Sequence, residues 1–224
     1  MKTGFLLRLS AWLLVSAPML GAATISYDVT MNTIPLMGHP AGPFALNFQL
    51  NDGSGANDGN NTAVLSGFQF GGGSASGSPA LAGGASGNLA TSVTITDSAF
   101  FNSFTQPFVA GTQLRFTAQI TNNVDAGPTP DQFSFSILDR TGAELPSVST
   151  FFDVFVTIDI TSPNLTVRSF ASDPTRIPAG GGPTITMAAA QVQAQGVPEP
   201  GTLFLAGCAM AFMIVKRRRG GRQA

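Results

Sequence analysis

The chain has 224 residues and a formal charge of only −1, but its charged residues are unevenly distributed. Residues 24–196 contain no lysine, and four arginines stand against eleven acidic residues, which gives this body a net charge of about −7. Such an acidic body argues against nucleic-acid binding, where neutralisation of phosphates dominates affinity. The body has one histidine and no cysteine, which excludes disulfides and the usual zinc ligand sets.

The first 23 residues have the pattern of a secretory signal peptide. Lys2 and Arg8 give a positive start, residues 9–15 form a short apolar core, and residues 21–23 are small, as a signal peptidase requires. An N-terminal membrane anchor and a buried first helix are the alternatives. We expect residues 1–23 to be removed and the mature chain to begin near residue 24.

Residues 24–194 alternate apolar and polar side chains, which is typical of half-buried antiparallel strands. The segments with this pattern are 25–31, 44–50, 64–70, 92–96, 114–120, 133–138, 152–160, 165–170 and 184–192. About nine strands without an amphipathic helix can cover their apolar faces only by packing two sheets together. We therefore expect one all-β exported domain, an antiparallel two-sheet β-sandwich that is jelly-roll-like, with a closed barrel as the alternative.

Two glycine-rich stretches interrupt the alternation. Residues 71–87 read as a flexible surface loop. Residues 51–61 place several hard oxygen ligands in one loop, which favours calcium. These candidate ligands are Asp52, Ser54, Asn57, Asp58 and Asn60. The spacing departs from the EF-hand pattern, because position twelve from Asp52 is Ala63, and a turn rich in Asn and Asp is the alternative.

Candidates for catalysis are few, so we expect no catalytic residue and no enzyme activity. His39 is the one histidine, and no Gly-x-Ser-x-Gly motif accompanies it. Asp153 and Asp159 lie six residues apart on one predicted strand, about 20 Å, which is too far for a glycosidase pair. Glu144 lies in a predicted turn. The phenylalanines of segment 98–109 are expected in the core rather than on a sugar-binding platform: Phe100, Phe101, Phe104 and Phe108.

The C-terminal segment has three parts. Residues 195–201 form a linker that contains Pro198, Glu199 and Pro200, and residues 202–215 form an uncharged apolar run. As a helix this run would be about 21 Å long, against roughly 30 Å of hydrocarbon core, so it could span a bilayer with local thinning. Residues 216–224 are a basic tail that we expect to stay in the cytoplasm as a stop-transfer signal. Its first cations are Lys216, Arg217, Arg218 and Arg219.

Together these parts, VPEPGTLFLAGCAMAFMIVKRRRG at residues 197–220, resemble the PEP-CTERM sorting signal of Gram-negative bacteria. The resemblance implies processing by an exosortase, a membrane-embedded protease, and species with this signal often make exopolysaccharide. Residues 48–77 and 131–142 are also similar to a group of uncharacterised PEP-CTERM proteins with a β-rich exported domain. No activity carries over from that group.

These observations predict a non-enzymatic protein of the bacterial surface or extracellular matrix, associated with exopolysaccharide. It would be tethered to the inner membrane through residues 202–215 before processing and then reach the cell surface or the exterior. A calcium- or glycan-binding β-sandwich module is the alternative, and an exported hydrolase is a third. We expect no cofactor other than calcium, and no nucleic-acid partner.

Overall fold

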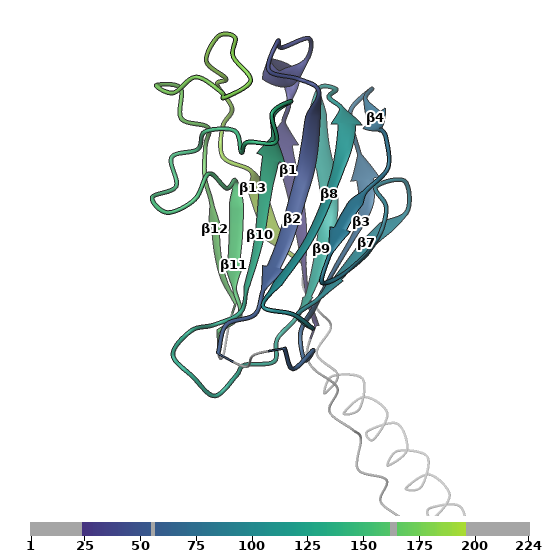
Figure 1. The fold of residues 1–224 in the computed structure, drawn as a ribbon, viewed down its shortest axis with the longest axis vertical. Helices are drawn as coiled ribbons and strands as arrows, with labels where there is room; N and C mark the ends of the chain where they lie inside the picture. Colours follow the sequence, from purple (N-terminus) through teal and green to yellow (C-terminus); the bar gives the residue numbers. More distant parts are fainter. Residues whose placement is uncertain (1–23, 55–56, 162–164, 196–224) are drawn as a thin grey trace, which may run out of the picture.

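The computed structural model describes residues 24–54, 57–161 and 165–195, which form two antiparallel sheets packed face to face (Figure 1). The prediction of an all-β domain built from two antiparallel sheets is confirmed. Among the described residues, helix is limited to one 3-10 turn, Ile34–Leu36, and no helix there is long and apolar enough to cross a membrane. The predicted signal peptide at 1–23 and the predicted membrane helix at 202–215 lie outside the described residues.

Within the described residues, one sheet has six strands and the other has seven. The six-stranded sheet runs in the order β13 (Gln191–Ala194), β1 (Thr24–Asn32), β9 (Gln113–Thr121), β3 (Thr62–Gln69), β7 (Ser92–Thr96) and β6 (Gly84–Gly87). The seven-stranded sheet runs in the order β12 (Thr166–Ser169), β11 (Val156–Asp159), β10 (Gln132–Leu138), β2 (Phe44–Asn51), β8 (Phe101–Val109) and β4 (Ser74–Ala75), with β5 (Ala80–Ala82) also paired to β8.

Alternation determines which side chains lie between the sheets. Along β9 the buried positions are every second residue, from Leu114 to Ile120, and the residues between them face outward. The core is centred on Phe48 of β2, whose ring contacts Phe116 of the opposite sheet at a centroid distance of 5.3 Å. Phe135 of β10 packs on the same ring at 5.2 Å. One aromatic cluster therefore joins the two sheets.

Strand β8 was missed in the sequence because its inward face mixes Phe with amides. Asn102 and Gln106 are buried on the same face as Phe104 and Phe108. The Asn102 amide donates to the Leu50 carbonyl at 2.9 Å, and its oxygen accepts from the Gly84 amide at 2.8 Å. Buried amides are tolerated when they are hydrogen-bonded in this way, and they hide the apolar alternation. The expected loop at 71–87 also contains the short strands β4, β5 and β6.

The predicted strand at 152–160 begins only at Val156, and the inward position predicted for Phe152 was wrong. The side chains of Phe151 and Phe152 are 88% and 68% exposed. The reason lies in Asp153, which accepts a hydrogen bond from the Ser147 amide at 2.9 Å and pairs with Arg176. These contacts hold residues 147–153 as a loop over the outer face of the sheet. Phe100 and Phe101, expected in the core, are exposed as well.

Candidate metal centre

Four acidic side chains meet at one end of the sandwich, the lower end in Figure 1, where loops from both sheets come together. Asp52 follows β2, Asp97 follows β7, Asp125 lies between β9 and β10, and Asp131 directly precedes β10. One carboxylate oxygen each from Asp52, Asp125 and Asp131 lie within 4.8 Å of one another. Asp97 faces Asp131. We call these four residues the acidic end cluster.

The acidic end cluster is buried although it consists of carboxylates. Asp52 is 2% exposed and Asp97 is fully buried. Asp131 is also buried, and Asp125 is half-buried. Buried carboxylates are rare unless they are paired with a cation or hold a metal ion. The four arginines of the described residues do not face this cluster: Arg115, Arg168 and Arg176 pair with Asp28, Asp159 and Asp153. Arg140 lies in the turn after β10.

Asn61 is the scaffold of the cluster. Its backbone amide donates to Asp97 at 2.9 Å, and its side-chain amide donates to Asp131 at 2.7 Å. Its side-chain oxygen accepts from Thr121 Oγ1 and from the Asn123 amide, both at 3.0 Å. All polar atoms of Asn61 are hydrogen-bonded, so Asn61 holds the carboxylates in position. A ligand would therefore have to bind other oxygens of the cluster.

Several oxygens at this end have no hydrogen-bond partner although they are buried. They are Asp52 Oδ1, Asn60 Oδ1, Asp97 Oδ1, Asn122 Oδ1 and Asp125 Oδ2. Each such atom costs free energy, about 1–3 kcal/mol and more for a charged group, unless something binds it. Among the described residues no donor reaches these particular oxygens, and a hard cation would satisfy such a group of acceptors.

The pKa values of Asp52 and Asp97 are raised by burial and by the neighbouring carboxylates. Burial raises the pKa of Asp97 to about 7, and the neighbouring Asp131 and Asp58 carboxylates add to the effect. Burial also raises the pKa of Asp52, together with the charges of Asp131, Asp58 and Asp125. A bound cation would offset this repulsion and keep the carboxylates ionised.

The donor set indicates which ion would fit. All available atoms are carboxylate and amide oxygens from loops, with no sulfur and no imidazole, which excludes the usual zinc sites. Calcium takes six to eight oxygen ligands in flexible geometry, whereas magnesium demands a near-ideal octahedron and keeps several waters. Asp52, Asp125 and Asp131, whose carboxylate oxygens converge, could supply part of a calcium shell together with Asn60, and the buried Asp97 lies beside Asp131.

The residues proposed from the sequence divide into two groups. Asp52 and Asn60 lie at the acidic end cluster, where the Asn60 side chain donates to Asp125 at 2.6 Å. Ser54 instead joins two loops, because its hydroxyl donates to the Thr129 carbonyl at 3.0 Å. Asn57, exposed and at positive φ, donates its backbone amide to Asp52, and Asp58 is exposed and accepts from Asn60.

Sequence reasoning missed Asp97, Asp125 and Asp131. A signal was present, because Asp97 directly follows the predicted strand 92–96 and Asp131 lies two residues before the predicted strand 133–138. Acidic residues at strand ends on the same end of a sandwich converge. Recognising this requires the strand order, which alternation does not give.

The other candidates are engaged elsewhere. His39 lies in a loop, where Nε2 contacts the Pro183 carbonyl at 2.9 Å and Nδ1 accepts from the Ala41 amide at 3.1 Å. The sorting residues Pro198, Glu199 and Pro200 lie outside the described residues. The same holds for the four cations that follow, Lys216, Arg217, Arg218 and Arg219.

Comparison with known proteins adds information on these C-terminal residues. No curated protein and no solved structure matches the chain significantly. Residues 196–219 match the family model of the PEP-CTERM protein-sorting motif. The resemblance found in the sequence is thereby confirmed, and the β-rich domain is consistent with it. The chain therefore carries a PEP-CTERM protein-sorting motif, which implies an exported protein that is sorted by an exosortase, a membrane protein.

Proposed function

We propose that this chain is a non-enzymatic protein of the bacterial surface or extracellular matrix whose folded domain binds calcium at the acidic end cluster. The observation that carries the proposal is the set of buried, unpartnered oxygens contributed by loops of both sheets. A calcium ion there would join the two sheets at one end and stabilise the exported domain. Extracellular calcium-binding modules typically have dissociation constants of roughly 10⁻⁴ to 10⁻³ M, and we expect this site to bind calcium in that range.

The sorting part of the proposal concerns the two ends of the chain. Residues 1–23 direct export and are removed, and residues 202–215 hold the protein in the inner membrane with the basic tail inside. An exosortase-like protease then acts at or near Pro198, Glu199 and Pro200, and the domain reaches the surface or the matrix in association with exopolysaccharide. The motif match at residues 196–219 supports export and the exosortase step.

The non-enzymatic role is supported by the positions of the candidate groups. Both ring nitrogens of His39 are used by backbone partners. Asp153 is held by Arg176 and the Ser147 amide, so neither group is free to act as a general base.

Calcium binding is tested by isothermal titration calorimetry on the full chain in mild detergent, after treatment with EGTA. We expect binding of calcium with a stronger response than magnesium, and a rise in the unfolding temperature. Asp52→Asn combined with Asp125→Asn should weaken binding at least tenfold. The matched control is Asp28→Asn, which changes a half-buried carboxylate on β1 and should leave binding unchanged. Equal calcium binding by the double variant and the control would refute the proposal.

Sorting is tested separately by mass spectrometry of the mature C-terminus in a host that carries an exosortase. We expect cleavage near residues 198–200 in the unmodified chain. Replacement of all three residues by alanine should leave the intact tail in the membrane fraction. An identical mature C-terminus in both chains would show that the motif is not the processing signal.

A further inference from the structure

Three adjoining hollows lie on the outer face of the seven-stranded sheet, and Phe152 lines all of them. The largest, about 600 Å³, lies between the loop at 147–153 and Arg176. The second, about 440 Å³, extends over β11 and β12 toward Arg168. The third, about 440 Å³, extends over β10 and β2 toward Phe100 and Phe101. We call this continuous surface the Phe152 face.

The Phe152 face carries exposed aromatic rings that the core does not use. Phe151 and Phe152 are 88% and 68% exposed, and Phe100 at the far end is 70% exposed. Phe101 is also largely exposed. Tryptophan is absent from the body and Tyr27 is buried, so phenylalanines are the aromatic rings that the described residues offer to a ligand here, these four and the half-buried Phe170 of the second hollow. Clustered exposed rings on a soluble domain usually mark a binding surface.

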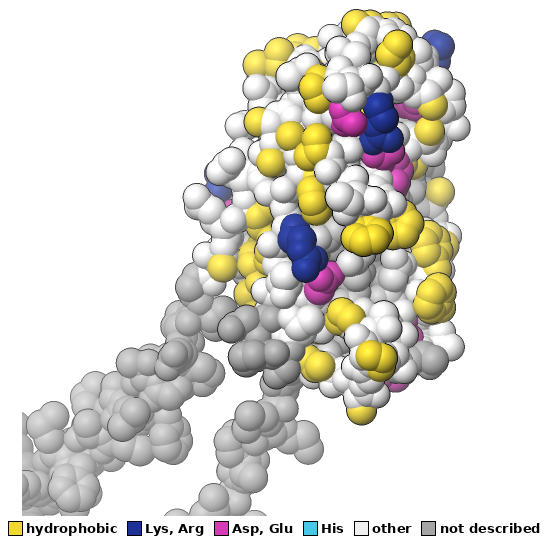
Figure 2. All heavy atoms as spheres, turned by 90° about the vertical axis from the view of Figure 1, so that its left-hand side faces the viewer, with side chains coloured by type: hydrophobic (Ala, Val, Ile, Leu, Met, Phe, Trp, Pro, Cys, Tyr) yellow, Lys and Arg dark blue, Asp and Glu magenta, His cyan; other side chains and the backbone are white. Residues whose placement is uncertain are grey.

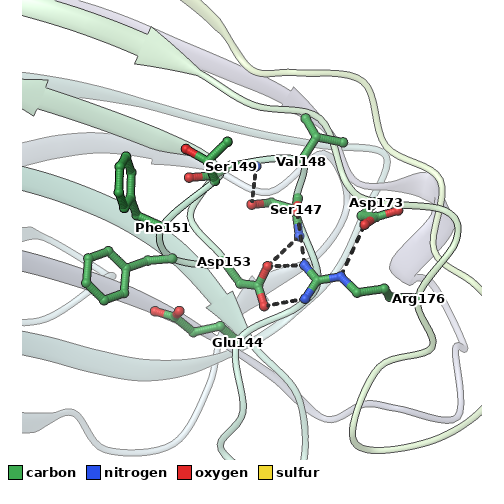
Figure 3. A pocket seen from close by; sticks show the side chains of 10 residues that line it. Glu144, Ser147, Val148, Ser149, Phe151, Asp153, Asp173 and Arg176 are labelled. Carbon is green, nitrogen blue, oxygen red and sulfur yellow. Dashed lines mark hydrogen bonds and ion pairs between the residues drawn. The ribbon is translucent and has the colours of Figure 1, made fainter.

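Polar groups held in fixed positions lie between these rings. In Figure 3 the Arg176 guanidinium lies between Asp153 and Asp173, with Phe151 and Glu144 across the hollow. Arg176 also donates to the Ser147 carbonyl at 3.0 Å. Figure 2 shows that arginine–carboxylate contacts and hydrophobic side chains alternate on this side of the molecule.

The floor of the face offers further hydrogen-bonding groups. Gln132 donates to Asp159 at 2.7 Å, and Asp159 also accepts from Arg168 at 2.6 Å. Asn51 Oδ1 is buried and has no partner, although it lines the third hollow.

The charge of the face selects against anions. Glu144, Asp153, Asp159 and Asp173 outnumber Arg168 and Arg176, and the body has no lysine. Burial raises the pKa of Glu144, and the nearby Asp153 charge contributes. Negative charge is therefore already unfavourable at this position, and an anionic ligand would add to it. Uronates, sulfates and phosphates are therefore disfavoured.

We propose that the Phe152 face binds a neutral polysaccharide. A sugar ring has an apolar C–H face, which can stack on phenylalanine, and a rim of hydroxyls, which both donate and accept hydrogen bonds. Three hollows in succession suit several sugar units of one chain. A peptide strand would need unpaired backbone groups at a sheet edge, and this surface is a sheet face.

The inference goes beyond calcium binding and stands on different residues, so either can fail alone. The probes are hydroxyethyl cellulose, dextran and galactomannan as neutral chains and alginate as the anionic one. Binding of the full chain in detergent is measured by calorimetry and affinity electrophoresis at constant calcium. We expect binding to at least one neutral polysaccharide and at least tenfold weaker binding to alginate.

The variants distinguish a loss of aromatic contacts with the ligand from a loss of folding stability. Phe151→Ala combined with Phe152→Ala should weaken neutral binding at least tenfold with the unfolding temperature unchanged, since both rings are exposed. Phe152→Trp should keep or strengthen binding. The control, Ile34→Ala, removes an exposed apolar side chain from the 3-10 turn and should change nothing. The inference is overturned if no neutral probe binds, if alginate binds equally well, or if the double variant binds like the unmodified chain.

Discussion

Asp97 and Asp131 come from different sheets, yet both are held by the same residue. The Asn61 backbone amide donates to Asp97 at 2.9 Å, and the Asn61 side chain donates to Asp131 at 2.7 Å. Two buried carboxylates are thereby brought together without a cationic side chain among the described residues facing them. Without a bound cation this arrangement costs folding free energy, and the calcium ion that we propose would offset that cost and join the two sheets.

Asp97→Asn should therefore have opposite effects in the presence and absence of calcium. In EGTA near pH 8 it removes a buried charge beside Asp131, and we expect a gain of roughly 1–2 kcal/mol in unfolding free energy, or several degrees in unfolding temperature. In millimolar calcium the unmodified chain should be the more stable one, because the variant lacks a negative charge that would stabilise the bound ion. Thermal unfolding in both buffers checks this crossing. Parallel shifts in both buffers would contradict it.

Gly53→Ala should weaken the same site without removing a ligand. A Cβ at residue 53 would overlap the Thr129 carbonyl oxygen and lie 2.6 Å from the carbonyl carbon of Pro130. The loops bearing Asp52 and Asp131 would have to separate, at a cost of about 1–3 kcal/mol. Calorimetry should show weaker calcium binding. Ser54→Ala, which only removes hydrogen bonds to Thr129, serves as the milder comparison, and an equal loss in both variants would argue against the steric cause.

Phe48→Ala should be among the most damaging core changes. Its ring contacts those of Phe104, Phe116, Phe133 and Phe135, so truncation opens a cavity where the two sheets meet. We expect a loss of about 3–5 kcal/mol. Urea unfolding with a calcium-saturated sample measures it. Phe151→Ala removes the same atoms from an exposed position and should stay within about 0.5 kcal/mol.

Asp139→Ala should destabilise the domain in a pH-dependent way. Burial alone would raise the pKa of Asp139, but hydrogen bonds from Thr141, Gly180 and Ala143 together lower it. Because the folded pKa lies below the unfolded value, the contribution of Asp139 is complete above the unfolded pKa. It is lost as the pH falls through the folded pKa.

We expect Asp139→Ala to cost about 2–3 kcal/mol at pH 6, since buried amides lose their acceptor. Urea midpoints measured at pH 6 and pH 3 should show the difference between variant and unmodified chain shrinking in acid. Asp139→Asn, which keeps an acceptor without the charge, should show a smaller difference. A difference that grows in acid would contradict the assignment.

The alternation of apolar and polar residues along the chain predicted much of the fold. In β1, β2, β9 and β10 the inward positions hold apolar residues, with Tyr27 as the one polar-tipped side chain. The predicted segments match these strands within about two residues. Strand β8 could not be found this way, because Asn102 and Gln106 take inward positions and accept from the backbone amides of Gly84 and Leu89, 18 and 17 residues away in sequence. Phe152 was misplaced because its exposure depends on Arg176, 24 residues later, holding Asp153.

The site was predicted only as far as one loop could reveal it. Asp52 and Asn60 are close in sequence, and their oxygen-rich loop indicated calcium. Asp97, Asp125 and Asp131 join them through the pairing of β3 with β7 and β9, and through the packing of the two sheets. These are long-range relationships that composition and periodicity do not contain.

The chain enters and leaves the described domain at the end that bears the acidic end cluster. Thr24 pairs with Thr121, and the Gln195 amide donates to the Ser26 carbonyl at 2.7 Å. A pull on the C-terminal segment thus reaches the domain through β13, which is joined to β1 by four residue pairs. This short edge strand is the mechanical link of the molecule: under load it should peel from β1 before the other strand pairs separate, which would lengthen the connection to the C-terminal segment while the rest of the core stays folded.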